Sequence, residues 1–362
     1  MIRGHGGNVD ELARRLGCDP RTIADMSSNV NPLGPMPELM AHLKDRLDQI
    51  RTLPEVDAAA ITAAFARTCG LDARQVLAGN GSSEILYMLP RALNPRRAVI
   101  LGPTYADYAD ACRLAGVPVH HVLAGPEDGF APPLDRMAAH LEDGDLVFVC
   151  NPNNPTGRLI DARRIASLAA AHPGCTFLVD ESYLPFDPDA VSLAGRGPEN
   201  LMVLSSLSKI HRIPGLRIGF VAGASERIAR VASWRIPWSV NALAQSAVAF
   251  IGAHPRAVAD FVARTRRFLG IERARFRQGL EGLKAIQPFP SATSFILARL
   301  AVPHSAAAVC RALGDAGILI RDASNFVGLG PAYVRFSLKE PAVNDRAIDC
   351  LSRFLKGGGH GC

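Results

Sequence analysis

The sequence predicts an α/β protein with a large domain, whose mostly parallel sheet is covered by helices, and a smaller α+β domain. Short apolar runs rich in Val, Ile, Leu and Phe are typical of buried strands. Helical patterns such as DARRIASLAAAHP (161–173) alternate with them, which favours a parallel sheet. The runs are RAVILGP (97–103), LVFVCNP (146–152), TFLVDES (176–182), LMVLSSL (201–207) and RIGFVAG (217–223).

The pattern divides the chain into three sections. Residues 46–253 would form the large domain. Residues 254–362 would form the small one, because a long Arg-rich helical stretch there precedes three short strand patterns. Residues 1–45 carry the Gly/Pro-rich turns GHGGN and NPLGPMP, and we expect them to pack with the small domain. Ligands of parallel sheets bind beyond the carboxyl ends of strands, where most polar motifs of this chain fall.

The amino-acid composition indicates which classes of ligand and partner this protein could bind. The chain has 362 residues and is 48% hydrophobic, which is ample for a buried core. The net charge is +6, yet no Lys/Arg run exceeds two residues and aromatic residues make up only 6%. A small anionic substrate therefore fits the charge better than nucleic acid. No apolar run reaches the length of a membrane span, so we expect no membrane partner.

The eight cysteines are scattered without a CxxC pair, and several lie in apolar runs. This indicates reduced thiols in a cytoplasmic protein. The start of the chain lacks the apolar stretch of a signal peptide. The Gly-rich tail KGGGHGC holds one His and one Cys, but a frayed end is the simpler interpretation, and we expect no metal.

Lys209 is one of only five lysines, and it lies in the apolar stretch SSLSKIHRIPGLRIGF (205–220). Desolvation favours a neutral lysine amine, which can form a Schiff base with an aldehyde. The hydroxyls of Ser206 and Ser208 and the guanidinium of Arg217 add a phosphate-binding set. An aldehyde that carries a phosphate is pyridoxal 5'-phosphate. Without these neighbours, an ordinary surface lysine would be the better interpretation.

A second set precedes a helical pattern in LAGNGSSEILYMLPRAL (77–93). Gly81 permits close backbone approach, and N–H groups at the start of a helix attract phosphate. Ser82 and Ser83 add hydroxyls, although either would equally serve as an ordinary helix cap.

Three further motifs follow strands and would surround a cofactor ring. Asp180 in FLVDESY could pair with a pyridinium nitrogen and strengthen the ring as an electron sink. Tyr183 and Asn154, the latter in NPNNPTG, could bond a ring oxygen. Tyr105 in GPTYADY could stack on the ring. Each has a plainer interpretation, as a helix cap, a loop or a half-buried aromatic.

Taken together, NPNNPTG, DESY and SLSK with an arginine eight residues later resemble the fold-type I pyridoxal-phosphate enzymes of the aminotransferase class I/II family. The resemblance runs over nearly the whole chain and implies a transferase-like fold and the cofactor pyridoxal 5'-phosphate. It implies that Lys209 is the Schiff-base lysine and Asp180 the pyridinium partner, with Tyr105 stacked on the ring. The implied phosphate ligands are Gly81, Ser82, Ser83, Ser206, Ser208 and Arg217, and Asn154 and Tyr183 would bind the ring oxygen.

The resemblance also implies substrate contacts and a homodimer. Arg335 in YVRFSL matches an arginine that grips the substrate carboxylate, and Arg321 in GILIRD matches a second arginine. Relatives carry a tyrosine that reaches the partner subunit's cofactor phosphate, but TLPEVDA has Leu53 at that place. That contact between subunits is therefore lost or replaced.

Two N-terminal motifs distinguish members of the family. HGGN (5–8) and SSNVNPLG (27–34) resemble the start of cobalamin-pathway decarboxylases that convert L-threonine O-3-phosphate to (R)-1-aminopropan-2-ol O-phosphate. His5 and backbone N–H groups at Gly6 would form an anion nest, with Asn29 and Asn154 as further substrate contacts beside Arg321 and Arg335. The alternatives are an aminotransferase for histidinol phosphate, a decarboxylase preferring L-serine O-phosphate and a non-catalytic binding protein.

Overall fold

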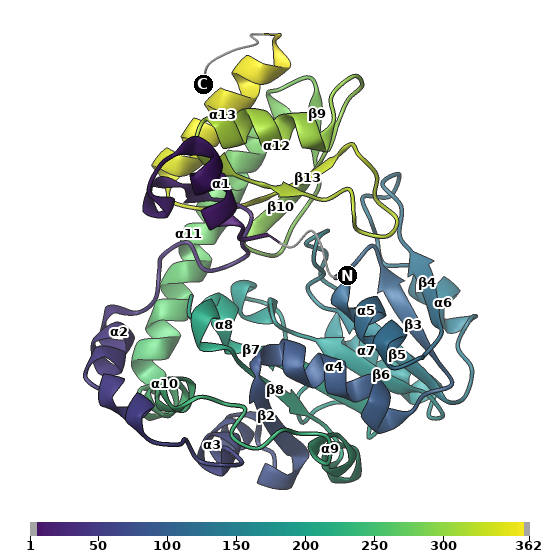
Figure 1. Ribbon diagram of the computed structural model, residues 1–362. Helices are drawn as coiled ribbons and strands as arrows, with labels where there is room; N and C mark the ends of the chain where they lie inside the picture. Colours follow the sequence, from purple (N-terminus) through teal and green to yellow (C-terminus); the bar gives the residue numbers. More distant parts are fainter. Residues whose placement is uncertain (1–5, 358–362) are drawn as a thin grey trace.

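The structure is a computed structural model, and it describes residues 6–357 (Figure 1). Its large unit is built on a seven-stranded sheet in the order β2-β8-β7-β6-β5-β3-β4. Only β8 runs against its neighbours, so the prediction of a mostly parallel sheet is confirmed. The strands are β2 (Val76–Asn80), β3 (Arg97–Gly102), β4 (Val119–Leu123), β5 (Asp145–Cys150), β6 (Thr176–Asp180), β7 (Leu201–Ser206) and β8 (Ile218–Ala222).

The five predicted strand segments correspond to β3, β5, β6, β7 and β8, whereas β2 and β4 were not predicted. β2 ends in Gly79 and Asn80, which read as a turn before a helix. β4 carries His120 and His121 and is only partly buried at the edge of the sheet. Neither segment therefore shows the continuous apolar run of a central strand.

Helices cover both faces of this sheet because successive strand residues point to opposite sides. Ala98 and Ile100 of β3 pack with α4 (Gly81–Leu93), α5 (Asp107–Leu114) and α9 (Ser225–Ala232). Val99 and Leu101 face the opposite core with α2 (Pro37–Lys44), α3 (Ala59–Cys69), α7 (Ala162–Ala171) and α10 (Ala242–Ala253). Two shorter helices complete the unit, α6 (Leu134–Ala138) and α8 (Leu207–Ile210).

The small unit holds an antiparallel sheet in the order β12-β13-β10-β9, and its helices pack into one core with the sheet. Residues 24–25 of the N-terminal section join this unit, since β1 pairs in parallel with β11, whereas α2 packs in the core of the large unit. The boundaries predicted at residues 45 and 253 stay a prediction. The elements are α1 (Val9–Leu16), β1 (Ala24–Asp25), α11 (Pro255–Glu281), β9 (Ile286–Pro288), β10 (Phe295–Leu300), α12 (Ala306–Asp315), β11 (Ile318–Leu319), β12 (Arg321–Asp322), β13 (Tyr333–Ser337) and α13 (Pro341–Leu355).

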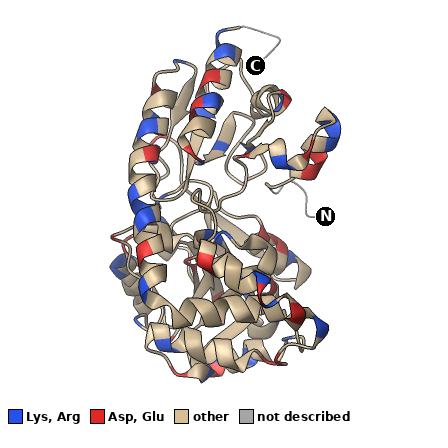
Figure 2. Ribbon diagram, turned by 90° about the vertical axis from the view of Figure 1, so that its left-hand side faces the viewer, with Lys and Arg blue, Asp and Glu red and all other residues tan. Residues whose placement is uncertain are grey.

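Helix α11 links the two units. Its 27 residues give a length of about 40 Å, enough to run from beside α10 to the sheet of the small unit (Figure 1). Figure 2 shows basic and acidic residues mixed along the helices that face the viewer. None of the helices between residues 6 and 357 combines the length and apolarity needed to cross a membrane.

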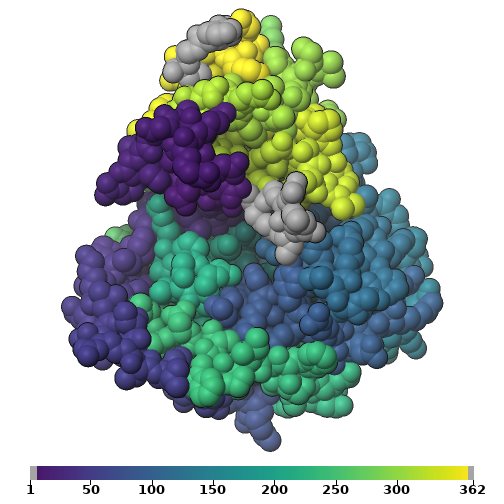
Figure 3. Space-filling model, in the orientation of Figure 1, coloured from purple at the N-terminus to yellow at the C-terminus, as the bar shows by residue number. Residues whose placement is uncertain are grey.

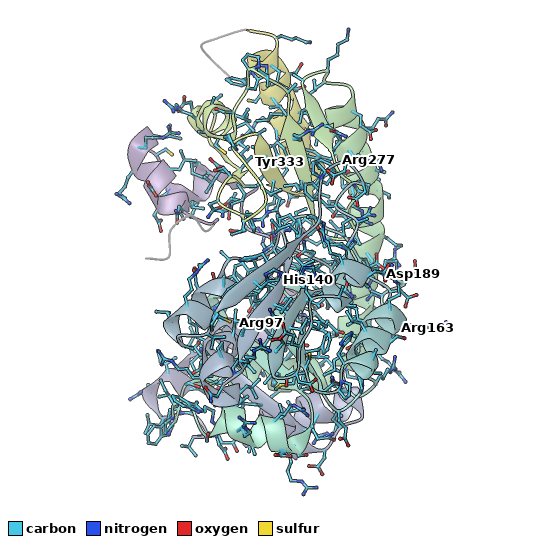
Figure 4. The ribbon with its side chains drawn as sticks, turned by 90° about the vertical axis from the view of Figure 1, so that its right-hand side faces the viewer. Arg97, His140, Arg163, Asp189, Arg277 and Tyr333 are labelled. Atoms are coloured by element: carbon cyan, nitrogen blue, oxygen red, sulfur yellow. The ribbon has the colours of Figure 1, made fainter. Side chains whose placement is uncertain are left out.

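A partly buried ion pair lies at the end of the large sheet away from the small unit. Arg97 at the start of β3 bonds both carboxylate oxygens of Asp145, at 2.9 and 3.0 Å, and Asp145 is almost fully buried. Arg97 also donates to the carbonyl of His140. Figure 4 shows Arg97 and His140 on the large unit, away from Tyr333 of the small unit.

We predict that Arg97→Ala lowers the free energy of unfolding by about 3 kcal/mol, because it leaves the Asp145 carboxylate buried and unpaired. Urea unfolding followed by circular dichroism measures the change. Arg74→Ala is the matched control, since the Arg74–Asp72 pair is exposed and is worth less than about 1 kcal/mol. Equal losses in the two variants would contradict the prediction.

Candidate active site

A cavity of about 580 Å³ lies between the carboxyl ends of the parallel strands and the small unit. Residues of the N-terminal section close one side of it. Figure 3 shows the start of this section, in dark purple, packed against the small unit. Five cationic side chains line the cavity, and Asp25 is the only carboxylate among its lining residues in the described part of the chain. The cations are Lys209, Arg212, Arg217, Arg321 and Arg335.

A smaller pocket of about 90 Å³ adjoins this cavity and shares Tyr105, Asn154, Tyr183 and Lys209 with it. Its other lining residues come from the ends of β5, β6 and β7, the starts of α4 and α5, and Arg217 just before β8. The structure thus brings together most of the predicted cofactor residues. They are Ser82, Ser83, Tyr105, Asn154, Asp180, Tyr183, Ser206, Lys209 and Arg217.

Lys209 lies on α8, the single helical turn directly after β7. The pKa of its amine is lowered to about 8, mainly by burial and also by the positive charges of Arg217 and Arg335, while Asp180 opposes the shift. A lysine amine in this setting loses its proton readily and becomes a nucleophile near neutral pH. The carbonyl of Lys209 accepts the backbone N–H of Asn31 at 3.0 Å, which ties this turn to the N-terminal section.

Asp180 ends β6 and is held by two donors. The Tyr108 hydroxyl donates to one carboxylate oxygen at 2.7 Å, and the Ser182 N–H donates to the other at 2.9 Å. Tyr108 is fully buried and stacks on Phe148 with a centroid distance of 5.2 Å. Sequence reasoning missed Tyr108. The sequence offered no specific signal for it, because Tyr105 lies in the loop before α5 and Tyr108 is the second residue of that helix.

The start of α4 and Arg217 form a cradle that only glycine permits. Gly81 has a φ of +75°, and a Cβ there would lie 2.5 Å from a guanidinium nitrogen of Arg217. A Cβ on Gly219 would lie 2.4 Å from the backbone nitrogen of Ser82. The cradle therefore presents helix N–H groups, hydroxyls and one guanidinium at the same point. Ser208 does not line the cavities, because its hydroxyl donates to the Ile218 carbonyl at 3.4 Å.

The polar side chains above the pocket are linked to one another. Asn154 accepts a hydrogen bond from Arg335, and the Asn29 amide donates to the Tyr183 hydroxyl at 3.4 Å. Burial raises the pKa of Tyr183 to about 12, against the lowering effect of Arg335. The Tyr105 hydroxyl donates to Asp107 at 2.7 Å, which leaves its ring edge-on to Tyr108.

Arg321 and Arg335 occupy directly opposed positions on β12 and β13 and are both buried. Burial lowers the pKa of both guanidinium groups, that of Arg335 to about 10. Within residues 6–357 their hydrogen-bond acceptors are amide and carbonyl oxygens rather than carboxylates. Buried Arg335 Nε has no acceptor among the described residues. Like charges opposed across strands are unfavourable, so an anionic ligand would stabilise this arrangement.

The donor set fits pyridoxal 5'-phosphate. The cradle at Gly81 suits a phosphate, Asp180 suits a protonated ring nitrogen, and Lys209 suits an aldehyde carbon. The fold and the site together define a fold-type I pyridoxal-phosphate enzyme.

Comparison with known proteins gives the family. A family model described as aminotransferase class I and II matches residues 21–351, and the chain belongs to this family, whose members use pyridoxal 5'-phosphate. The chain is 32% identical to threonine-phosphate decarboxylase of Salmonella typhimurium, over 98% of this chain and 97% of that protein. It is 33% identical to histidinol-phosphate aminotransferase 2 of Pseudomonas aeruginosa, over 97% and 94%.

A solved structure is similar to this chain in both sequence and fold. The L-threonine-O-3-phosphate decarboxylase of Porphyromonas gingivalis superposes with a TM-score of 0.83 at 34% identity, covering 92% of this chain and all of that chain. His5 lies outside the described residues, and Leu53 is 74% exposed on the surface.

We predict that cofactor capture follows the protonation of Lys209. Because the pKa of the amine is lowered to about 8, the neutral form grows as the pH rises through 8. Apoprotein mixed with pyridoxal phosphate should therefore be fixed by borohydride with a midpoint near that pH, read by mass spectrometry at Lys209. Lys209→Ala is the control and should not be labelled at this site. A midpoint at the ordinary lysine pKa, about 10.4, would contradict the prediction.

Proposed function

We propose that this protein decarboxylates L-threonine O-3-phosphate to (R)-1-aminopropan-2-ol O-phosphate, as in cobalamin biosynthesis. The observation that carries the proposal is the docking of the glycine pair of HGGN beside the cavity. The Gly7 N–H donates to the Ser27 hydroxyl at 2.7 Å, and Gly6 lines the cavity. The two motifs that resemble those decarboxylases thus meet at one edge of the site.

The charge of the cavity supports a substrate with two anionic groups. A carboxylate and a phosphate on one amino acid would be complementary to the opposed guanidinium groups of Arg321 and Arg335. Arg217 is committed to the cradle at α4 and would hold the cofactor phosphate instead. Asn29 and Asn154 add amide groups at the same wall of the cavity.

Bound pyridoxal phosphate supplies an electron sink for the bond that breaks at the substrate Cα. Asp180 would keep a proton on the ring nitrogen, and Tyr105 would cover the ring. Arg335 and Asn154 would orient the carboxylate so that the bond between Cα and the carboxylate breaks and CO₂ leaves. Lys209 would then deliver a proton to Cα. The same residues would serve an aminotransferase if the Cα–H bond were oriented for cleavage.

The 33% identity to a histidinol-phosphate aminotransferase makes an aminotransferase the second candidate. Histidinol phosphate carries a phosphate but no carboxylate, so it would leave one of the two guanidinium groups without an anion. L-Serine O-phosphate carries both groups and lacks one methyl, which is worth about 1–3 kcal/mol in a pocket.

Incubating the holoenzyme with L-threonine O-3-phosphate tests the proposal. We expect release of CO₂ and of aminopropanol phosphate without any added 2-oxoacid, and a kcat/KM about 10-fold or more above that for L-serine O-phosphate. Lys209→Ala should lose turnover. Glutamate-dependent conversion of histidinol phosphate without CO₂ release would instead establish the aminotransferase.

We further propose a homodimer that buries an apolar patch of the large unit. Residues 53–57 lie against residues 235–245, since Trp238 N–H donates to the Val56 carbonyl at 3.0 Å and Arg235 to the Asp57 carbonyl at 2.8 Å. Exposed apolar side chains gather on these and the preceding residues, and a patch of this kind typically marks a protein interface. The patch comprises Leu47, Ile50, Leu53, Val56, Trp234, Ile236 and Trp238.

We predict that Ile236→Glu shifts the protein from dimer to monomer in sedimentation velocity, because the carboxylate would have to be buried without a partner. Val302→Glu is the matched control. Val302 is 95% exposed on the small unit, and its replacement should leave the dimer intact. A wild-type protein that sediments as a monomer at micromolar concentration would refute the interface.

A further inference from the structure

The turn at residues 25–29 connects the small unit with the cavity. The Met26 N–H donates to the Leu319 carbonyl, and the Met26 carbonyl accepts from the Ser337 N–H, at 2.8 Å each. Arg335 donates to the Ser27 carbonyl at 2.8 Å, and Lys339 donates to the Ser28 carbonyl at 3.2 Å. The backbone of this turn is therefore fixed to the sheet that carries the two opposed arginines.

Asp25 organises the inside of the turn. One of its carboxylate oxygens accepts from the Ser27 N–H at 2.9 Å, the Ser27 hydroxyl at 2.6 Å and the Ser28 N–H at 3.2 Å. Burial would raise the pKa of Asp25, but these hydrogen bonds and the charge of Lys339 outweigh it and lower the pKa. Asp25 is thus a carboxylate at neutral pH, and its charge is committed to the turn although it lines a cationic cavity.

The hydroxyl of Ser27 has a second role, which depends on the first. Because its single proton is donated to Asp25, its lone pairs face outward, and one accepts the Gly7 N–H at 2.7 Å. The approach is so close that a Cβ on Gly6 would lie 2.5 Å from the Ser27 carbonyl oxygen. Gly7 has a φ of +90°, which favours glycine. Both glycines of HGGN are therefore required by this contact.

We propose that Asp25 is a positioning residue for the substrate: through Ser27 it holds the Gly6–Gly7 segment at the edge of the cavity, where the segment completes the pocket for the substrate's anionic group. The proposal rests on the function proposed above. Asp25 would itself repel an anion, so its place in the cavity wall is explained by the three donors that it orients. The Asp25 carboxylate acts indirectly, through the Ser27 hydroxyl and the Gly7 backbone N–H.

Hydrogen exchange of the holoenzyme without substrate tests the positioning directly. Ser27→Ala removes the acceptor of the Gly7 N–H, and Asp25→Asn removes the charge that orients the Ser27 hydroxyl. We expect amide exchange in the peptide that contains Gly7 to rise about 10-fold in both variants. Asp19→Asn is the matched control, because Asp19 accepts the Arg21 N–H at 2.8 Å in a similar but exposed turn. Unchanged exchange in Ser27→Ala would overturn the proposal.

Gly6→Ala approaches the same contact from the N-terminal side and leaves the small unit untouched, so it stays informative if Asp25→Asn fails to fold. For all three variants we expect the KM for L-threonine O-3-phosphate to rise about 10-fold while kcat changes less than about 2-fold. The cofactor affinity, read from the visible absorbance, should not change. A fall in kcat at constant KM would contradict a role in substrate positioning.

Calorimetric titration of the holoenzyme with L-threonine O-3-phosphate separates the two proposals. If the wild-type protein binds this compound but releases no CO₂, the decarboxylase function fails while the positioning role stands. If Ser27→Ala binds it with the wild-type Kd, the positioning role fails, whatever reaction the enzyme catalyses. A Kd weakened about 10-fold in Ser27→Ala and unchanged in Asp19→Asn supports the positioning role.

Discussion

The site depends on buried positive charge whose hydrogen-bond acceptors, within residues 6–357, are amide and carbonyl oxygens rather than carboxylates. Arg321 and Arg335 face each other across two neighbouring strands and are buried, although opposed like charges weaken a sheet. Aromatic rings offset part of this cost, since Phe326 and Phe295 lie 5.2 Å from the two guanidinium carbons. Carbonyl and amide oxygens offset another part. The electrostatic cost that these contacts do not offset lowers the stability of the fold. A bound anion would remove that cost, so the same arrangement increases the affinity for anions.

The same constraint explains how the two units act together. Arg335 donates both to Asn154, in the loop that follows β5 of the large unit, and to the Ser27 carbonyl of the N-terminal section. Two residues after Asn29, the Asn31 N–H bonds the Lys209 carbonyl, and the Asn31 side chain bonds Ile210 and Thr265. One short segment therefore joins the Arg335 guanidinium to the backbone of Lys209.

The positions of some site residues could be predicted from the sequence, because a lysine or an aspartate next to an apolar strand has few alternative roles. Lys209 and Asp180 follow apolar strands, and parallel strands bring their carboxyl ends to one edge, so their meeting required only the correct fold class. Tyr108 could not be found in this way. Its role depends on the rotation of α5, which places its hydroxyl 2.7 Å from Asp180. Ser208 shows the reverse case, because a serine beside the lysine turns away to bond a carbonyl.

Asp25 shows why a local motif is insufficient even when it is visible. The run ADMSSN reads as an ordinary turn, and an aspartate that accepts N–H groups two and three residues on is common in turns. The role of Asp25 depends on two residues distant in sequence. Gly7 donates its N–H to the Ser27 hydroxyl that Asp25 orients, and the charge of Lys339 stabilises the Asp25 carboxylate. Lys339 lies more than three hundred residues away and is itself buried, with its pKa lowered to about 8 mainly by burial. Since both partners of the turn are supplied by tertiary packing, only the folded chain shows that Gly6 and Gly7 form a single unit with the turn at Ser27.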